Sequence, residues 1–422
     1  PTKYTNDYFN NLNVSPRLGF SYKSGSVTLR GGSGVFVGRI PFAWIGYAYY
    51  NDGIGFGSFD LNNRSTLTNV GDPIKDGAKT FAFNNGQKNL VQIDLVDNKF
   101  KMPKVWRSNL AIDKTIAGYK FTLEGIYTEV LTDLKFQQIN IVTDNPTYYS
   151  FDVNKQMPVY TGAKVNANLS NAYLLSNTDK GYRYQLTAIV NKKYDWNLDV
   201  YAAYTYGVSK DITNGIRNSM ESNWQLNQSL TPNDPKLAYS NFDIRHRIVS
   251  QLSYKVKKTK IGLVVNLQSG VPFTWGLVNG TLQNNPQSAG LVYVFKDEEV
   301  NKYITNPDQA KAFTDFVNSD KYLSSRKGQF TERNGGRTPW SKTVDVKISQ
   351  NIGKRLQITA DVFNVLSGKI YFISNTFNST SSVGLSKVSG EVFSFVKPTQ
   401  APYSVDQVNS KWQAQLGLRY NF

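Results

Sequence analysis

Segments in which apolar and polar side chains alternate over about ten residues recur along the chain, and they restrict its fold more than any other feature. Residues 196–209 show the pattern best, with an apolar or aromatic side chain at every even-numbered position. Side chains of a β-strand point alternately to its two faces, so this period of two predicts strands with one apolar face. Ten residues tilted by about 45° cover about 23 Å, close to the height of the apolar band of an outer-membrane barrel.

The pattern predicts an all-β fold, an antiparallel transmembrane β-barrel. Eleven strands are expected, at 14–23, 26–37, 105–115, 119–142, 182–194, 196–211, 242–255, 260–271, 343–352, 356–366 and 411–422. Five tight turns are expected, at Ser24-Gly25, Ala117-Gly118, near Asp195, at Lys257-Lys258 and at Gly353-Lys354. They alternate strictly with long loops at about 38–104, 143–181, 212–241, 272–342 and 367–410. Short periplasmic turns and long extracellular loops are typical of bacterial outer-membrane barrels, so the spacing favours that location.

The last predicted strand ends on an aromatic residue. Apolar residues at even positions from 412 to 422 alternate with Gln, Gly, Arg and Asn, and the strand closes on Phe422. Such an ending resembles the C-terminal signal that outer-membrane barrels present to their insertion machinery, so we expect a native C-terminus. Aromatic residues at the ends of apolar strand faces are expected in the membrane girdles. They are Trp196, Tyr206, Trp412, Tyr420 and Phe422.

Composition excludes several classes of site. The chain has no Cys and a single His, which excludes thiolate metal sites and a histidine-based metal site. It also lacks a window of about 18 consecutive apolar residues, so no transmembrane helix is expected. The net charge of +17 could attract nucleic acid or an anionic surface, but Lys and Arg are scattered without a dense basic run. We therefore expect no metal, no cofactor and no nucleic-acid partner.

An odd number of strands is unusual, because single-chain bacterial barrels have even numbers. A sheet of eleven strands would leave two long edges exposed to lipid. The sequence therefore predicts the C-terminal part of a larger barrel, as half of a plugged barrel of 22 strands. The plug and the other half of the wall are expected outside this sequence or in another chain.

Charged residues on the polar phase of the strands are the candidate binding residues. Asp243, Arg245 and Arg247 alternate with His246, and two interpretations remain open for them: a salt-bridge ladder in the wall, or contact with a plug or substrate. The full set expected to face the lumen or the plug is Arg30, Asp243, Arg245, Arg247, Asp361 and Arg419. His246 shares the phase of the apolar residues around it, which favours a structural role at the membrane interface.

Other motifs have simpler interpretations. The glycine run at 31–34 lacks the Lys-Ser/Thr and the helix of a phosphate-binding loop, so we expect close approach by another backbone. Residues 306–319 predict a helix, with Asp308 near a capping position, that forms either a small loop core or a docking surface. Acidic pairs such as Glu298-Glu299 have no accompanying base or nucleophile, and we predict no catalytic site.

Several segments resemble the TonB-dependent receptors of Bacteroidota that carry an N-terminal carboxypeptidase-regulatory-like domain, often called Oar-like. They occur in family order along nearly the whole chain: VSPRLGF (14–20), LRGGSG (29–34), GRIPFAW (38–44), FDIRHR (242–247), ERNGGRTPW (332–340), DVFNVL (361–366) and QLGLRYNF (415–422). The resemblance implies an outer-membrane receptor that takes up an unidentified substrate. The N-terminal domain, the TonB box and the plug of such receptors are not found in this sequence.

The resemblance implies several partners: outer-membrane lipid and lipopolysaccharide, the plug and the other barrel half, and TonB through the missing segment. Because a fold does not fix a function, a second hypothesis is a non-transporting scaffold that binds a surface lipoprotein or another envelope complex. A third is a secreted soluble β-protein such as an adhesin. Aromatic loops such as 44–59 could contact a ligand by stacking.

Overall fold

The structure is a computed structural model. It describes residues 12–52, 90–144, 147–152, 155–160, 162–213, 215, 217–278, 289–374, 380–389 and 391–422. Of the loop 44–59, which is expected to contact a ligand, residues 53–59 lie outside the described residues.

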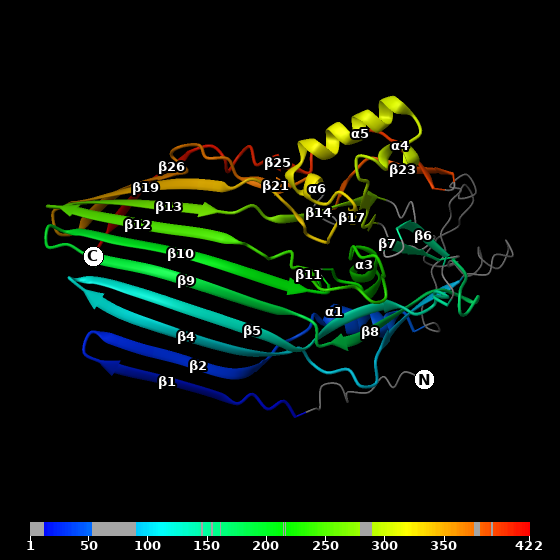
Figure 1. The fold of residues 1–422 in the computed structure, drawn as a ribbon. Helices are drawn as coiled ribbons and strands as arrows, with labels where there is room; N and C mark the ends of the chain where they lie inside the picture. The colour runs from blue at the N-terminus through cyan, green and yellow to red at the C-terminus, as the bar shows by residue number, and fades with distance from the viewer. Residues whose placement is uncertain are drawn as a thin grey trace, which may run out of the picture.

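Eleven long strands pair side by side, each antiparallel to its neighbours and in sequence order (Figure 1). They are β1 (Arg17–Ser24), β2 (Val27–Val37), β4 (Lys104–Ile116), β5 (Tyr119–Gln138), β9 (Tyr182–Lys193), β10 (Leu198–Asp211), β12 (His246–Val256), β13 (Thr259–Gln268), β19 (Ser341–Ile352), β20 (Leu356–Phe363) and β26 (Gln413–Tyr420). The prediction of eleven antiparallel strands is confirmed. The expected strands also have the observed boundaries to within a few residues, except at three ends discussed below.

All five predicted tight turns are present, and they lie together at one end of the sheet with the C-terminus (Figure 1). The long loops lie together at the other end. Left-handed backbone closes these turns: Gly25 has φ +56° and Gly353 has φ +65°. A side chain at such a φ is strained, which explains Gly at these two turns. Position 31 requires glycine for a different reason. A Cβ there would lie 2.8 Å from the Asn109 carbonyl oxygen of the neighbouring strand, which is too close.

Three strand ends differ from the sequence-based ranges. The predicted strand 119–142 ends at Gln138, and its last residues, from Asp133, pair with β8 (Leu169–Thr178) instead of β9. Residues 242–245 precede β12 rather than belonging to it, because the Asp243 side chain accepts a hydrogen bond from the Ser209 main chain. The predicted strand 356–366 ends at Phe363, because Asn364 follows in left-handed conformation at φ +48°.

Two clusters of buried residues lie among the loops. The first loop core joins α1 (Phe42–Tyr50), β3 (Val91–Val96), β8 and α3 (Met220–Gln225) around the last residues of β5, at its loop end. Its largest buried side chains include Trp44, Phe136, Tyr173, Leu175 and Trp224. β3 pairs with β8 in parallel, and α1 contacts β3. Local alternation did not predict this core, because its parts come from four separate loop segments.

The second loop core is larger and covers the loop end of β13 and β19 (Figure 1). Its strands are β14 (Pro272–Val278), β15 (Ala289–Gly290), β16 (Tyr293–Val294), β17 (Gln329–Phe330), β18 (Gly336–Arg337), β22 (Thr380–Ser382), β23 (Leu385–Ser389) and β24 (Val392–Phe395). Its helices are α4 (Val300–Tyr303), α5 (Pro307–Ser319) and α6 (Lys321–Ser325). Short strands β6 (Thr147–Asp152), β7 (Lys155–Val159), β11 (Ala238–Tyr239), β21 (Tyr371–Ile373) and β25 (Tyr403–Val405) complete the loops.

The predicted helix 306–319 is confirmed as α5. Its N-cap is Asn306, whose side chain accepts hydrogen bonds from the main-chain nitrogens of Asp308 and Gln309, while Asp308 lies in the first turn. Phe313 and Val317 are buried in the second loop core, which favours the loop-core interpretation of this helix over a docking surface. Within the described residues, no helix is long and apolar enough to cross a membrane.

A buried carboxylate in the first loop core gives a prediction. Asp94 in β3 is 1% exposed and accepts hydrogen bonds from Asn51 Nδ2 at 3.1 Å and Gln92 Nε2 at 3.0 Å. Burial, with a smaller contribution from the charge of nearby Glu221, raises the pKa of Asp94 to about 6, although the two hydrogen bonds lower it. Since the unfolded pKa is lower, about 3.9, this group makes the core lose stability as pH rises from about 4 to about 6.

We expect Asp94→Asn to remove that part of the pH dependence, because an amide keeps the shape without the buried charge. The measurement is the opening free energy of β3 and β8 from amide hydrogen exchange at pH 4.5 and pH 7. Asp308→Asn, on an exposed turn of α5, is the matched control. A wild-type core that is as stable at pH 7 as at pH 4.5 would contradict the prediction.

Candidate functional site

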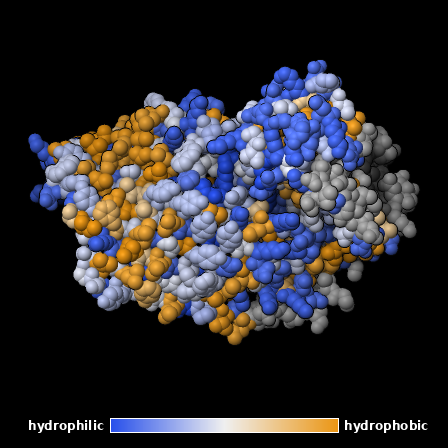
Figure 2. Space-filling view, viewed as in Figure 1, coloured by the Kyte–Doolittle hydropathy of each residue, from blue (hydrophilic) through white to orange (hydrophobic). Residues whose placement is uncertain are grey.

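The two faces of the eleven-stranded sheet differ in chemistry. On one face the even-numbered residues of β20 and β26 include Ile358, Leu416 and Leu418, which are 41%, 81% and 72% exposed. Figure 2 shows hydrophobic residues gathered over the strands, whereas the loop end is mostly hydrophilic. Large apolar side chains left exposed over a whole face fit contact with lipid rather than water.

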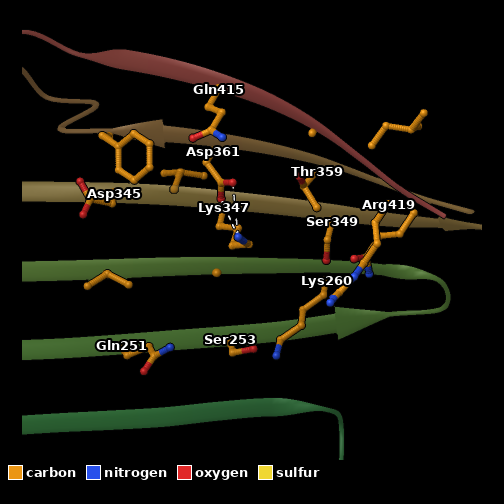
Figure 3. A pocket seen from close by; sticks show the side chains of 17 residues that line it. Gln251, Ser253, Lys260, Asp345, Lys347, Ser349, Thr359, Asp361, Gln415 and Arg419 are labelled. Atoms are coloured by element: carbon orange, nitrogen blue, oxygen red, sulfur yellow. Dashed lines mark hydrogen bonds and ion pairs between the residues drawn. The ribbon is translucent and has the colours of Figure 1, made fainter. Parts of the chain in front are cut away.

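The opposite face is polar and hollowed; we call it the concave face. A cavity of about 840 Å³ lies on it, lined by β12, β13, β19, β20 and β26 (Figure 3). Strand register places Gly262, Lys347, Asp361 and Gln415 in one row across four strands. Charged residues of the cavity are Lys260, Asp345, Lys347, Asp361 and Arg419, and neutral polar residues are Gln251, Ser253, Ser349, Gln357, Thr359 and Gln415.

Ion pairs fix part of the concave face. Lys347 Nζ lies 3.1 Å from Asp361 Oδ1 on the neighbouring strand, as the dashed lines of Figure 3 show. On the same face, toward the β1 edge of the sheet, Arg30 Nε lies 3.1 Å from Asp113 Oδ2 and its Nη2 lies 3.6 Å from Glu124 Oε2. Two of the residues expected to face the lumen, Arg30 and Asp361, are therefore paired within the wall.

Asp243 is the centre of a buried cluster at the loop end of the sheet. Its side chain is fully buried, and its Oδ1 accepts a hydrogen bond from the Ser209 main chain at 2.6 Å. Its Oδ2 pairs with Arg245 Nη2 at 3.2 Å and with Arg337 Nη2. The two guanidinium groups also lie over the ring of Tyr239, at 4.7 Å and 5.4 Å from its centroid. We call these residues, with Arg333 and Asp211 described next, the rim cluster.

The rim cluster joins two of the sequence motifs. Arg333, 2% exposed, donates to the main-chain and side-chain oxygens of Asp211 at the end of β10. Asn334 Nδ2 donates to the Tyr239 carbonyl at 2.7 Å. The segment 332–340 of one long loop is thereby tied to 239–245 of another. A Cβ at Gly270 would lie 1.6 Å from the Thr338 carbonyl oxygen, so this return of the chain requires glycine.

The remaining predicted residues lie at identifiable places. Arg247 lines a smaller cavity of about 400 Å³ on the concave face, and Arg419 lines the main cavity. His246 lies between aromatic rings on the apolar side: its ring is 5.8 Å from Trp340 and 6.1 Å from Tyr204, nearly parallel to both. Its Nδ1 is 2.9 Å from the Tyr204 hydroxyl. This packing supports the structural interpretation of His246.

The aromatic residues proposed for the girdles fall at both ends of the strands. Trp196 lies in the turn between β9 and β10 and is 56% exposed, and Tyr420 and Phe422 contact each other at the same end. Tyr206 and Trp412 lie toward the loop end of β10 and β26. Their contact with the membrane surface stays a prediction.

Sequence reasoning missed several residues of the site. Lys260 and Lys347 lie on the polar phase of predicted strands and could have been found by the alternation alone. Arg333, Arg337 and Asp211 could not, because they meet only through the return of a long loop. No group of three or more His, Cys, Asp or Glu that could hold a metal ion occurs among the residues described above.

The rim cluster predicts a strong effect of Asp243→Ala. Removing this carboxylate leaves Arg337 and Arg245 without their partner, and breaking a buried pair costs about 3–5 kcal/mol. We expect the segment 332–340 to detach and become sensitive to trypsin in intact cells. Lys311→Ala, which removes an exposed pair with Asp315 on α5, is the control and should leave the cleavage rate unchanged. Equal cleavage of wild type and Asp243→Ala would contradict this role.

Solved structures with a similar arrangement include outer-membrane proteins of several bacteria. The outer membrane transporter YddB from Escherichia coli is 12% identical, with a TM-score of 0.47, and the match covers 98% of this chain and 41% of that one. The siderophore receptor PirA from Acinetobacter baumannii is 11% identical, with a TM-score of 0.45 and coverage of 97% and 41%. The FrpB iron transporter from Neisseria meningitidis is 10% identical, with a TM-score of 0.42 and coverage of 97% and 39%.

The chain thus spans about two fifths of the length of these solved structures. A search of curated proteins finds no match. The sequence profile of one family, described as an outer membrane beta barrel domain, matches residues 2–393. The chain therefore belongs to the outer membrane beta-barrel domain family, and its place is the bacterial outer membrane.

Proposed function

We propose that this chain is the C-terminal part of the barrel wall of a TonB-dependent receptor that takes up an unidentified substrate. The observation that carries the proposal is the hollowed polar face behind an apolar one. At membrane depth a polar surface is expensive unless it borders water or other protein, so polar side chains there mark a pathway or a binding surface. The Oar-like motifs of the sequence support the receptor class and a source in Bacteroidota.

Strand edges support the idea that more polypeptide completes the wall. Among the described residues, β1 pairs only with β2, and β26 pairs only with β20. Unpaired main-chain groups in lipid cost several kcal/mol each, so a barrel in a membrane has no open edge. We propose that about eleven further strands, a plug and the segment that contacts TonB belong to the same receptor, outside this sequence.

Cysteine labelling tests whether the concave face borders water. The chain has no native Cys, so single substitutions report on one site each. We expect Thr359→Cys, on the concave face, to react with a charged, water-soluble methanethiosulfonate in isolated outer membranes. Ile358→Cys, the adjacent residue on the apolar face, is the matched control and should stay unreactive, because lipid excludes the reagent. Equal labelling of the two positions would argue against a water-filled lumen.

A scaffold for envelope proteins is the second candidate. The two folded loop cores favour it, because they bury large aromatic side chains far more extensively than short connecting loops require. A rigid surface of this kind could hold a surface lipoprotein. Such a scaffold would need neither TonB nor a substrate.

A strain that lacks this gene and a strain that lacks TonB distinguish the transporter from the scaffold. If the protein is a transporter, we expect the same solutes to remain in the medium of both strains, whereas wild-type cells remove them. Mass spectrometry of spent medium measures these solutes. For a scaffold, solute depletion is unchanged in both strains, and a native pull-down retains a partner in fixed stoichiometry. Depletion that needs this gene but not TonB would contradict energised uptake.

A further inference from the structure

Three cations surround one tyrosine ring at the loop end of the sheet. Lys210 Nζ lies 4.9 Å from the centroid of the Tyr239 ring. The guanidinium carbons of Arg245 and Arg337 lie 4.7 Å and 5.4 Å from the same centroid. We call these four residues the cationic patch, and we propose that it binds the phosphate of a lipid headgroup in the outer leaflet of the membrane. The proposal is independent of the proposed function, because a transporter and a scaffold would both lie in this membrane.

Strand register places the cationic patch on the apolar side of the sheet. Side chains directly opposite each other on paired strands share a face. Lys210 of β10 has the same phase as Tyr206 on the apolar face, and its register partners are Tyr182 on β9 and Tyr239 on β11. The Arg245 guanidinium also lies 6.0 Å from the Tyr206 ring. The patch is therefore on the face opposite the cavity, which a plug inside the barrel would not cover.

A row of aromatic rings marks the depth of the patch. Tyr206 and His246 are register partners, and the Trp340 ring stacks on His246 at 5.8 Å. Toward the loop end, the centroids of Tyr206 and Tyr184 are 6.2 Å apart, and those of Tyr184 and Tyr182 are 6.4 Å apart. Aromatic rings of membrane proteins gather at the interfaces, and the long loops of outer-membrane barrels are extracellular. The patch at the end of this row would lie at the headgroup level of the outer leaflet.

Positive charge exceeds negative charge in the patch. Asp243 pairs with both Arg245 and Arg337, and its side chain is fully buried, whereas the two arginine side chains stay 24% and 25% exposed. Among the ion pairs of the described residues, none includes Lys210. The carboxylate of Asp211, the next residue, is already held by another arginine. Three cations that share one carboxylate leave a net positive surface, which attracts an anion.

Nearby strands do not supply the missing negative charge. The lipid-facing positions of β9, β10, β12, β13 and β19 include no Asp or Glu. Glu129 of β5 is the outward carboxylate in the same row, but Tyr182 lies between it and Lys210. Glu129 also accepts a hydrogen bond from the Tyr127 hydroxyl. The counter-charge of the patch is therefore expected from outside the protein.

The chemistry of the patch fits a lipid phosphate. Guanidinium groups match the geometry of phosphate oxygens, and a Lys ammonium adds a compact charge. Basic pockets at membrane interfaces bind anionic lipid headgroups. Apolar outward residues lie below the patch, such as the register partners Ile248 and Leu267, and acyl chains of the same lipid would cover them. We assign the patch to the phosphorylated glycolipid of the outer leaflet, lipopolysaccharide, rather than to a free anion.

Binding of lipid A, the phosphorylated anchor of lipopolysaccharide, tests the inference on the whole receptor in detergent. Native mass spectrometry counts the bound lipid as its concentration is raised. We expect bisphosphorylated lipid A to bind about tenfold more tightly than fully dephosphorylated lipid A. Inorganic phosphate, at a concentration that saturates free-anion sites, should not displace the lipid, because the acyl chains contribute to its binding.

Lys210 is the residue to vary, because it takes no part in the ion pairs of the rim cluster. Lys210→Gln should weaken binding of bisphosphorylated lipid A about fivefold, and Lys210→Arg should retain it. Lys192→Gln is the matched control and should leave binding unchanged. Lys192 also faces outward over a tyrosine ring, 4.6 Å from the centroid of Tyr119, but at the tight-turn end. Heat-dependent migration on gels verifies that each variant is folded.

Several results would overturn the inference. Equal binding of the two forms of lipid A would show that the phosphate is not recognised, and unchanged binding in Lys210→Gln would exclude the patch. Displacement by inorganic phosphate would assign the patch to a free anion. A photoreactive residue in place of Tyr182, beside Lys210, tests for a protein occupant in isolated outer membranes. Crosslinking to lipopolysaccharide supports the inference, whereas crosslinking to a protein of defined mass overturns it.

Discussion

Main-chain hydrogen bonding in lipid is the constraint on which this structure depends. The hydrocarbon core offers no water to a free N–H or C=O, so strands that cross it must pair along their whole length. Antiparallel pairing of neighbours in sequence order meets this need with turns of two to four residues. Once every strand spans the membrane, the side chains divide into one face toward lipid and one toward the interior. The apolar and polar faces of the sheet follow from this division.

Outside the membrane a different set of interactions holds the chain. Each of the two loop cores is built around buried aromatic residues. The ion pairs of the rim cluster tie the loop segment 332–340 to Asp211 and Asp243 at the strand ends. Buried ion pairs add little net stability compared with apolar packing, but removing one partner is costly. Their effect is therefore specificity: Asp243 and Asp211 accept Arg337 and Arg333, and this fixes where a long loop returns to the sheet.

Ion pairs between neighbouring strands hold part of the interior face. Arg30 and Lys347 are held by carboxylates on neighbouring strands, which stiffens the wall without offering a charge to a ligand. Strand register therefore decides which basic residues meet a carboxylate within the wall. A barrel can vary this register-defined surface without changing its apolar outside, so the cargo of related proteins can differ while the fold persists.

By itself, the sequence determined the strands, the tight turns and the split into two faces, because the period of two is a local property of each segment. It also determined α5, whose helical spacing and Asn306 cap are local. Only the tertiary structure decided the loop cores, the turn of β5 toward β8, and the meeting of Arg337 with Asp243. These contacts join residues far apart in the chain, in loops where apolar positions follow no period. Local patterns cannot rank such pairings, because their free energy comes from burial and charge pairing that exist only after the chain has folded.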